Sequence, residues 1–245
     1  MRDWTAYKTR TYLEKSTKVT FSKISRDWNA YKTRTYIKHF FQKRVSYNLS
    51  FPGLYKTKAI DIYKKNLYSA VIADTLDSLG YHKQVLTPGI TSLDSNVKIC
   101  GLARVGLYMP IYHDDEHVNV YEHEIALVDS LKENEVAVLC CHGNKKIAPW
   151  GELLSTRASY LKSAGCLTDG CVRDADMIRK MNFPVFSKGT NPVDTKFRGK
   201  MMMADVPGEI GDVRVESGDL VFGDNDGVVI VPSKIIEEVT SKALE

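Results

Sequence analysis

Hydrophobic side chains recur along the middle of the chain at spacings that predict alternating helices and strands. Between residues 63 and 80, apolar positions follow a helical period and a glycine comes after them, so a short amphipathic helix is predicted to end at Gly80. Residues 97–105 and 135–141 form apolar runs that are typical of buried strands, and residues 120–131 between them have helical spacing. The pattern indicates an α/β domain.

The second half of the chain continues this alternation and becomes rich in strands. Helices are predicted at residues 151–165, 175–181 and 233–244. Strands are predicted at residues 166–168, 184–187, 213–215, 220–222 and 228–231. Polar turns separate the last three strands, which is typical of β-hairpins. A length of 245 residues suits one folded domain, expected over residues 61–245, with an extension over residues 1–60.

The first 50 residues differ from the rest of the chain in charge. They contain 12 lysine and arginine residues against 3 acidic residues, a net charge of +9. The remaining 22 basic and 27 acidic residues give −5. The overall charge of +4 therefore describes a basic leader on a mildly acidic body.

An internal repeat lies within this leader. Residues 2–13 return as residues 26–37 with ten of twelve positions identical, and both copies interleave aromatic with basic side chains. This arrangement suits a nucleic-acid or acidic partner, but a tolerated duplication in a terminal extension also explains it. We favour the duplication and do not expect a nucleic-acid partner, because nothing else in the chain indicates one. Asp3, Glu14 and Asp27 argue against a transit peptide.

Cysteine usage and hydropathy indicate a protein of a reducing compartment. The five cysteines form no CxxC pair, and their odd number argues against a disulfide framework. No apolar run approaches the roughly 18 residues of a membrane-spanning helix, and the N-terminus lacks a signal-peptide pattern. We therefore expect a soluble, cytoplasmic protein without a membrane partner. Cys140 and Cys141 end a predicted strand, so they are expected to pack in the core rather than act as nucleophiles.

The residues most suggestive of chemistry lie at two predicted helix starts. The unpaired N–H groups of a first helical turn can bind a carboxylate, and the glycine of Gly151-Glu152-Leu153-Leu154 lets a ligand approach the backbone. Twenty intervening residues separate Glu152 from the pair Arg173-Asp174. Arg173 offers a planar fork of hydrogen-bond donors, and Asp174 offers an oxygen ligand for Mg²⁺ or Mn²⁺. Together they indicate a site for a small 2-oxo acid. Alternatively, Arg173 and Asp174 form an exposed ion pair and a helix N-cap.

These residues resemble the signature of the RraA-like family, which includes 4-hydroxy-4-methyl-2-oxoglutarate aldolases and proteins named as regulators of ribonuclease E activity. The similarity extends over residues 63–232 and includes, besides the acidic residue and Arg173-Asp174, the segments Phe183-Pro184-Val185-Phe186, Gly218-Asp219-Leu220-Val221 and Asp226-Gly227-Val228. The resemblance implies a catalytic domain with a β/β/α swivelling fold, like the phosphohistidine domain, assembled as homotrimers or hexamers with active sites between subunits.

The resemblance also implies a role for each motif residue. The backbone amides of Gly151, Glu152, Leu153 and Leu154 would hold the substrate carboxylate. Arg173 would contact the 2-oxo group, Asp174 would ligate Mg²⁺ or Mn²⁺, and Glu152 would orient a metal-bound water. The protein would then be a metal-dependent class II aldolase that cleaves 4-hydroxy-4-methyl-2-oxoglutarate or a related 4-hydroxy-2-oxo acid to pyruvate. Oxaloacetate would be decarboxylated at the same site, because that reaction passes through the same enolate.

Several features leave the function open. Aldolases of this family can place an acidic residue from a C-terminal extension in the neighbouring subunit's site, and Glu237, Glu238 and Glu245 are candidates without a clear alignment. Other members are non-enzymatic and bind a ribonuclease, so a regulator with a ribonuclease or RNA-associated partner is the alternative. A third label of the family, quinone-modifying methyltransferase, finds no support, because the chain lacks a glycine-rich nucleotide loop after a strand.

Two further polar clusters are expected to be structural. Residues 113–117 are dense in histidine and acidic side chains that can bind metal, but a solvated charged loop is the preferred interpretation. Asp224, Asn225 and Asp226 are similar to part of a calcium loop, but they lack the later glutamate of such a loop and are interpreted as hairpin-turn residues.

Overall fold

The structure, a computed structural model, describes residues 52–245 apart from residue 96 and residues 114–116, with side chains from residue 58 onward. The chain divides into two units, Met1–Phe51 and Pro52–Glu245, so the repeat of the leader lies outside the described residues. The described helices are α3 (Pro52–Asn66), α4 (Ser69–Ser78), α5 (Glu122–Asp129), α6 (Glu152–Tyr160), α7 (Ala175–Lys180), the 3-10 helix η2 (Ser233–Ile235) and α8 (Ile236–Ala243). The described strands are β1 (Thr91–Ser92), β2 (Ile99–Pro110), β3 (Glu135–Cys140), β4 (Gly165–Thr168), β5 (Val185–Ser187), β6 (Gly199–Ala204), β7 (Gly208–Ile210), β8 (Val213–Val215), β9 (Leu220–Gly223) and β10 (Val228–Val231).

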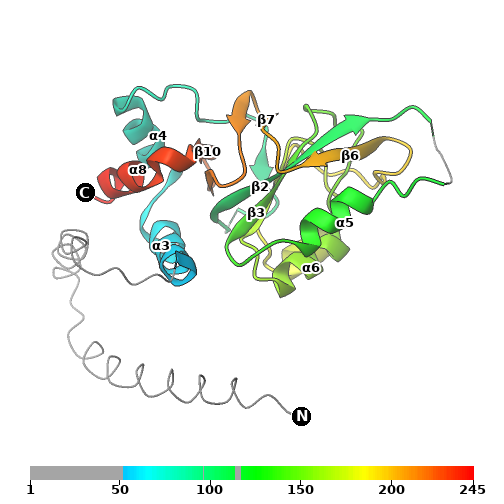
Figure 1. Cartoon of the computed structure of the whole chain (residues 1–245), viewed down its shortest axis with the longest axis horizontal. Helices are drawn as coiled ribbons and strands as arrows, with labels where there is room; N and C mark the ends of the chain where they lie inside the picture. The colour runs from blue at the N-terminus through cyan, green and yellow to red at the C-terminus, as the bar shows by residue number, and fades with distance from the viewer. Residues whose placement is uncertain (1–51, 96, 114–116) are drawn as a thin grey trace, which may run out of the picture. The chain divides into compact units, whose positions relative to one another are not determined.

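Eight of these strands form one mixed sheet (Figure 1). Their order is β1-β5-β4-β3-β2-β9-β10, and β6 also pairs with β2. Strands β2 to β5 pair in parallel, as expected for strands that are joined through helices, whereas β1, β6, β9 and β10 pair antiparallel. Strands β7 and β8 form a separate antiparallel pair.

Strand β3 is buried on both faces, which explains its continuous apolar sequence. Successive side chains of a strand point to opposite faces, so Val136 and Val138 pack in one cluster with residues of β7 and β8. Ala137 and Leu139 pack in a second cluster with α5, α6 and α7. A third cluster joins α3, α4 and α8 to β9 and β10. Figure 1 shows α5 and α6 together beside the sheet and α4 next to α8.

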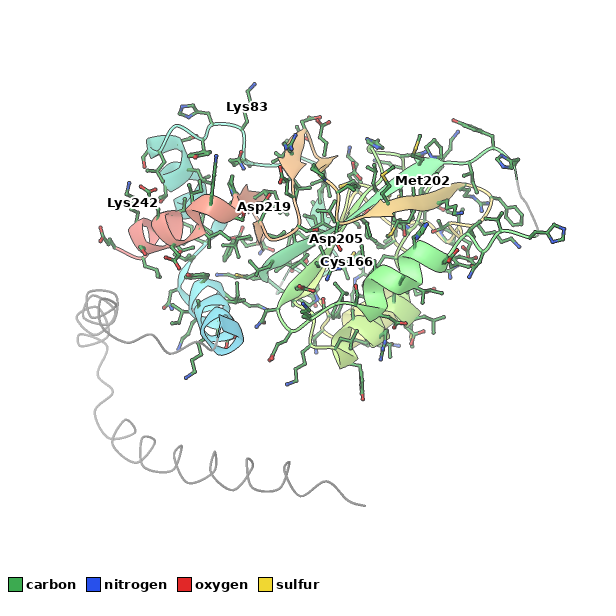
Figure 2. All side chains as sticks on the ribbon, viewed as in Figure 1. Lys83, Cys166, Met202, Asp205, Asp219 and Lys242 are labelled. Carbon is green, nitrogen blue, oxygen red and sulfur yellow. The ribbon has the colours of Figure 1, made fainter. Side chains whose placement is uncertain are left out.

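Cys140 and Cys141 pack in the core, as predicted, and the other cysteines are buried as well. All five are free and buried, and Figure 2 shows Cys166 inside the molecule, whereas Lys83 and Lys242 extend outward. Burial raises the pKa of the Cys140 thiol to about 12 and holds the pKa of Cys141 well above its ordinary value. Neither thiol therefore supplies a thiolate nucleophile at neutral pH.

Most elements predicted from the sequence pattern are confirmed, and the differences have local causes. Strand β2 continues beyond the predicted residues 97–105 to Pro110, because its second half pairs with β6. Helix α6 ends at Tyr160, earlier than predicted, because Lys162 adopts a left-handed φ of 59° and turns the chain toward β4. Elements α3, β1, β6 and β7 were not predicted.

Helix α3 spans the position predicted as the boundary between extension and domain, between residues 60 and 61. Ile60 and Tyr63 of this helix expose 5% and 7% of their surfaces and belong to the third cluster. Side chains on both sides of that position therefore contribute to the core. Among the residues that the structure describes, no helix is both long and apolar enough to cross a membrane.

Candidate active site

Two segments far apart in the sequence lie side by side at the start of helix α6. Trp150 pairs with Val172 in a parallel β-bridge, and the Arg173 amide donates to the Trp150 carbonyl at 3.0 Å. This pairing brings Gly151 against Arg173 and Asp174 although more than twenty positions separate them in the chain. The two halves of the predicted motif thus meet in space.

Gly151 leaves the space that these side chains occupy. A β-carbon at this position would lie 2.8 Å from Asp174 Oδ2 and 3.1 Å from Arg173 Cγ, closer than ordinary contacts. Its φ of −154° is extended backbone that any residue adopts. The close approach of the two functional side chains, rather than backbone strain, is therefore the reason for glycine here.

Asp174 points toward helix α6 and does not cap its own helix α7. Its backbone is left-handed, with a φ of 57°, which aspartate tolerates better than most residues. No side-chain capping bond to α7 is present at this residue. Instead, Oδ2 accepts a hydrogen bond from the Glu152 amide at 3.2 Å and lies 3.7 Å from Arg173 Nε. Asp174 thus occupies the N-cap position of α7, but its side chain is directed to the start of α6 instead of capping α7.

The first turn of α6 offers backbone donors next to Asp174. The amides of Leu153 and Leu154 precede the first bond of the helix, which runs from Ser155 N to the Gly151 carbonyl at 3.1 Å. Such first-turn amides, at the positive end of the helix dipole, attract anions. The Leu153 and Leu154 amides thus lie at this helix start, whereas the Glu152 amide is engaged by Asp174.

Arg173 is held by an aspartate that the sequence analysis did not single out. Its Nη1 donates to Asp194 Oδ2 at 2.8 Å, and the Tyr121 hydroxyl donates to Asp194 Oδ1 at 2.9 Å. Partial burial would raise the pKa of Asp194, but hydrogen bonds from the Lys196 amide, Tyr121 and Arg173 outweigh burial and lower it. Burial and the bond to Asp194 raise the pKa of Tyr121 to about 12. Asp194 therefore stays ionised and orients the guanidinium group.

A buried carboxyl group faces the same region from helix α5. Glu124 exposes 7% of its surface, and its Oε2 accepts a 2.5 Å hydrogen bond from the Tyr108 hydroxyl of β2. Burial is the main cause that raises the pKa of Glu124 to about 7. Glu124 shares the buried face of α5 with Leu127 and Val128. A charged residue at an apolar position of a helix was the signal that could have identified it.

These groups line one cavity of about 240 Å³ at the start of α6. Five of the six predicted site residues lie on its wall, namely Gly151, Leu153, Leu154, Arg173 and Asp174. The sixth, Glu152, contributes its amide to Asp174 and is not among the lining residues. The polar residues that the sequence analysis missed on this wall are Tyr121, Glu124, Asp194 and Thr195.

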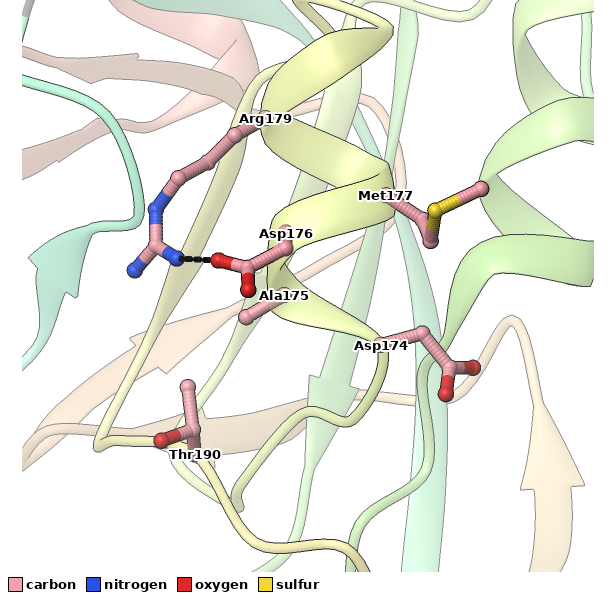
Figure 3. A pocket seen from close by; sticks show the side chains of 6 residues that line it. All are labelled: Asp174, Ala175, Asp176, Met177, Arg179 and Thr190. Atoms are coloured by element: carbon pink, nitrogen blue, oxygen red, sulfur yellow. Dashed lines mark hydrogen bonds and ion pairs between the residues drawn. The ribbon is translucent and has the colours of Figure 1, made fainter.

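A second hollow, of about 390 Å³, lies along helix α7. Asp176 and Arg179 form a 2.6 Å ion pair there, so their charges neutralise each other. Figure 3 shows the Asp174 carboxylate pointing away from this pair. Asp174 lines both hollows, whereas Glu124, Arg173 and Asp194 line the cavity at the start of α6.

Asp174 is suited to hold a catalytic metal ion. Among the described residues, no group of three or more histidine, cysteine, aspartate and glutamate side chains is arranged to enclose a metal. Mg²⁺ in enzymes commonly binds one or two carboxylates and completes its octahedron with substrate and water. The Asp174 side chain, 44% exposed on the cavity wall, meets that requirement.

The remaining candidate residues lie elsewhere. Asp224 and Asp226 lie in the turn between the antiparallel strands β9 and β10, where the Asp226 amide donates to Asp224 Oδ1 at 3.1 Å, which confirms the hairpin-turn interpretation. Asp224 also accepts hydrogen bonds from the amide and hydroxyl of Ser69 at 2.8 and 2.6 Å. Residues 114–116 of the histidine-rich cluster lie outside the described residues. Of the C-terminal acids, Glu238 pairs with Lys242 on α8 at 3.1 Å. Neither it nor Glu237 or Glu245 lies on the cavity wall.

Comparison with known proteins agrees with this fold and identifies the family. Residues 69–230 match the family model described as RraA-like, Aldolase/RraA. A Halalkalibacterium halodurans protein provisionally named 4-hydroxy-4-methyl-2-oxoglutarate aldolase is 30% identical over 182 residues, which cover 73% of this chain and 79% of that protein. Protein DlpA of Legionella pneumophila is 30% identical over 73% of this chain, but the match covers only 28% of DlpA.

A solved structure extends the comparison to the fold. RraAS2 of Streptomyces coelicolor, described as an unusual member of the RNase ES inhibitor RraA protein family, matches with a TM-score of 0.67 at 28% identity. The match covers 76% of this chain and 90% of that chain. Fold and site thus define an α/β protein with an arginine and carboxylates grouped at a helix start. The chain belongs to the RraA-like family, and the predicted fold class is confirmed.

Proposed function

We propose that this protein is a metal-dependent carbon-carbon lyase that cleaves a 4-hydroxy-2-oxo acid, such as 4-hydroxy-4-methyl-2-oxoglutarate, to pyruvate. One observation carries the proposal: Arg173, Asp174 and the free amides at the start of α6 lie on the wall of a single cavity. A relative that is 30% identical and provisionally named as such an aldolase supports it. Decarboxylation of oxaloacetate at the same site is part of the proposal.

The chain's own groups match the charges of such a substrate. The amides of Leu153 and Leu154 bind the substrate carboxylate, as first-turn amides of a helix do. The Arg173 guanidinium, oriented by Asp194 at 2.8 Å, contacts the 2-oxo oxygen. Cleavage of the C3–C4 bond moves an electron pair toward this oxygen, and a preorganised donor stabilises the enolate that forms.

Asp174 would hold the Mg²⁺ or Mn²⁺ ion, because its carboxylate lies between Arg173 and the start of α6. A divalent ion bound there supplies a Lewis acid for the developing enolate charge. The Glu152 amide keeps the Asp174 carboxylate directed at the cavity through its 3.2 Å bond.

Assembly as a homotrimer or hexamer belongs to the same proposal. Leu153 and Ile125 line the cavity and expose 73% and 46% of their surfaces. Apolar side chains exposed together at the rim of a site are typical of a surface that another chain covers. Analytical ultracentrifugation of the full chain tests this part independently.

Pyruvate release tests the activity. The protein is freed of metal with a chelator and assayed with 4-hydroxy-4-methyl-2-oxoglutarate and with oxaloacetate, before and after Mg²⁺ or Mn²⁺ is added. We expect turnover only with metal. Full turnover without metal would contradict the role of Asp174. No turnover under any condition, together with inhibition of a ribonuclease by the same preparation, would favour the non-enzymatic regulator instead.

A further inference from the structure

We infer that Glu124 is the catalytic residue that takes up and returns the proton during carbon-carbon cleavage. This inference rests on the proposed lyase function and deepens it. It begins from the position of Glu124, whose side chain comes from α5 and lines the same cavity as Arg173 and Asp174.

The environment of Glu124 is unusual for a structural carboxyl group. The residue is 7% exposed, and its one side-chain partner among the described residues is the neutral hydroxyl of Tyr108 at 2.5 Å. Buried carboxylates are normally paired with a cation, because burial of an unpaired charge is costly. Glu124 forms no salt bridge within the described part of the chain. Packing and ion pairing therefore do not account for an acidic residue at this buried position.

The other two carboxyl groups of the cavity are committed elsewhere. Asp194 is fixed by Arg173, Tyr121 and the Lys196 amide, and its lowered pKa makes it a weak base. Asp174 accepts from the Glu152 amide and is assigned to the metal. Glu124 is left as the group for proton transfer, and its pKa of about 7 suits both directions of transfer at neutral pH.

The proton balance is complete with one carboxyl group. The Glu124 carboxylate accepts the proton of the substrate's C4 hydroxyl as the C3–C4 bond breaks and the C4 carbonyl forms. The bonding electron pair moves into the enolate of pyruvate, which Arg173 stabilises. The Glu124 carboxylic acid then donates its proton to C3, so pyruvate leaves and the carboxylate is restored. C3 and C4 are adjacent atoms, so one side chain reaches both.

The inference predicts a specific pH dependence. The ionisable groups that act on Glu124 or respond to it are Tyr108 on β2, Tyr121 before α5, Cys141 after β3, Cys166 on β4, Arg173 and Asp194. The thiols and phenols stay neutral near pH 7 because their pKa values are raised. The proton-accepting form is the carboxylate, so kcat/KM should rise as the pH passes about 7 and then level off.

Exchange of the methyl protons of pyruvate with D₂O isolates this step. It is followed by proton NMR with Mg²⁺ present, alongside cleavage of the aldol substrate. Glu124→Gln keeps an acceptor for Tyr108 but cannot carry the proton, so exchange should fall on the order of 10²- to 10⁴-fold. KM should change little. The matched control is Glu122→Gln, an exposed glutamate of the same helix, which should exchange at the wild-type rate.

Tyr108→Phe gives a second test that leaves Glu124 in place. The Tyr108 hydrogen bond lowers the pKa of Glu124, so its loss should move the rising limb of the pH profile to higher pH. An unchanged limb overturns the inference even if Glu124→Gln does not fold.

The outcomes separate the two proposals. Equal exchange in wild type and folded Glu124→Gln overturns the role of Glu124 and leaves the lyase proposal intact. Wild-type protein that shows neither exchange nor cleavage with Mg²⁺ or Mn²⁺ overturns both. Loss of exchange in Glu124→Gln alone, with the pH limb shifted in Tyr108→Phe, supports the inference.

Discussion

At the scale of single residues, Arg173 is defined by the geometry of its contacts rather than by its charge. It lies 2.8 Å from Asp194 and 3.7 Å from Asp174 while about a third of its side chain remains exposed to the cavity. Two carboxylates thus fix the direction of the planar guanidinium group. A lysine would keep the charge but not the fork.

We expect Arg173→Lys to fold normally and to lose most of its activity. Loss of one preorganised donor at a developing oxyanion typically costs 10²- to 10³-fold in turnover, about 3 to 4 kcal/mol. The matched control is Arg157→Lys. Arg157 forms an exposed ion pair with Asp129, at 2.7 Å, and is not among the cavity residues. Steady-state rates with circular dichroism decide the case. Near-wild-type turnover in Arg173→Lys would show that Arg173 is only an exposed ion-pair partner.

The raised pKa of Glu124 should make the free energy of unfolding depend on pH. Its folded pKa of about 7 lies above the ordinary value of 4.5, so the folded state holds the proton more tightly than the unfolded state. Stability from this group is therefore present at low pH and is lost as the pH rises from 4.5 through 7. Relative to Glu124→Gln, wild type should lose about 2 to 3 kcal/mol of unfolding free energy between pH 5 and pH 8. Urea titrations at both pH values measure the difference, and a pH-independent difference would show that the pKa is not raised.

At the scale of elements, the sequence pattern predicted the helices and strands whose buried positions can be recognised within a single segment of the chain. Strand β3 is an apolar run because both of its faces are covered, and helix α4 ends at Ser78, two residues before Gly80, whose φ is 83°. Strand β6 was not predicted, because three of its six residues are exposed and its pairing is with β2. Asp194 was missed for the same kind of reason: its contact with Arg173 depends on where a distant loop lies.

The close packing at the start of helix α6 can be tested by substitution of Gly151. A β-carbon in Gly151→Ala would press on Asp174 Oδ2 and on Arg173, which are side-chain atoms that can move. We therefore expect a small change in stability, within about 1 kcal/mol, but a large loss of turnover, because both functional groups are displaced. Thermal melting and kinetics of the same preparation test this. Full activity would mean that the positions of Asp174 and Arg173 beside Gly151 do not matter.

At the scale of the whole molecule, the fold depends on where the domain begins. Helix α3 contributes Ile60 and Tyr63 to the cluster that includes α4, α8, β9 and β10. Lys98 Nζ also donates to the Leu67 carbonyl, at 2.9 Å, which ties the end of this helical region to the sheet. The described unit, Pro52–Glu245, therefore includes residues from before the boundary that the sequence predicted at residue 60.

Two truncations distinguish these boundaries. A protein that begins at Pro52 should keep its melting temperature and any lyase activity, because every core residue described here is retained. A protein that begins after Asn66 loses the buried Ile60 and Tyr63 side chains, whose burial is worth about 3 to 6 kcal/mol together. That is a large share of the stability of a typical domain.

We expect the longer form to unfold cooperatively in urea near the full-length midpoint. The shorter form should unfold at a much lower urea concentration or be insoluble. Insolubility of the longer form would show that residues 1–51 are needed for folding or assembly, whereas equal midpoints would show that α3 contributes nothing to the core.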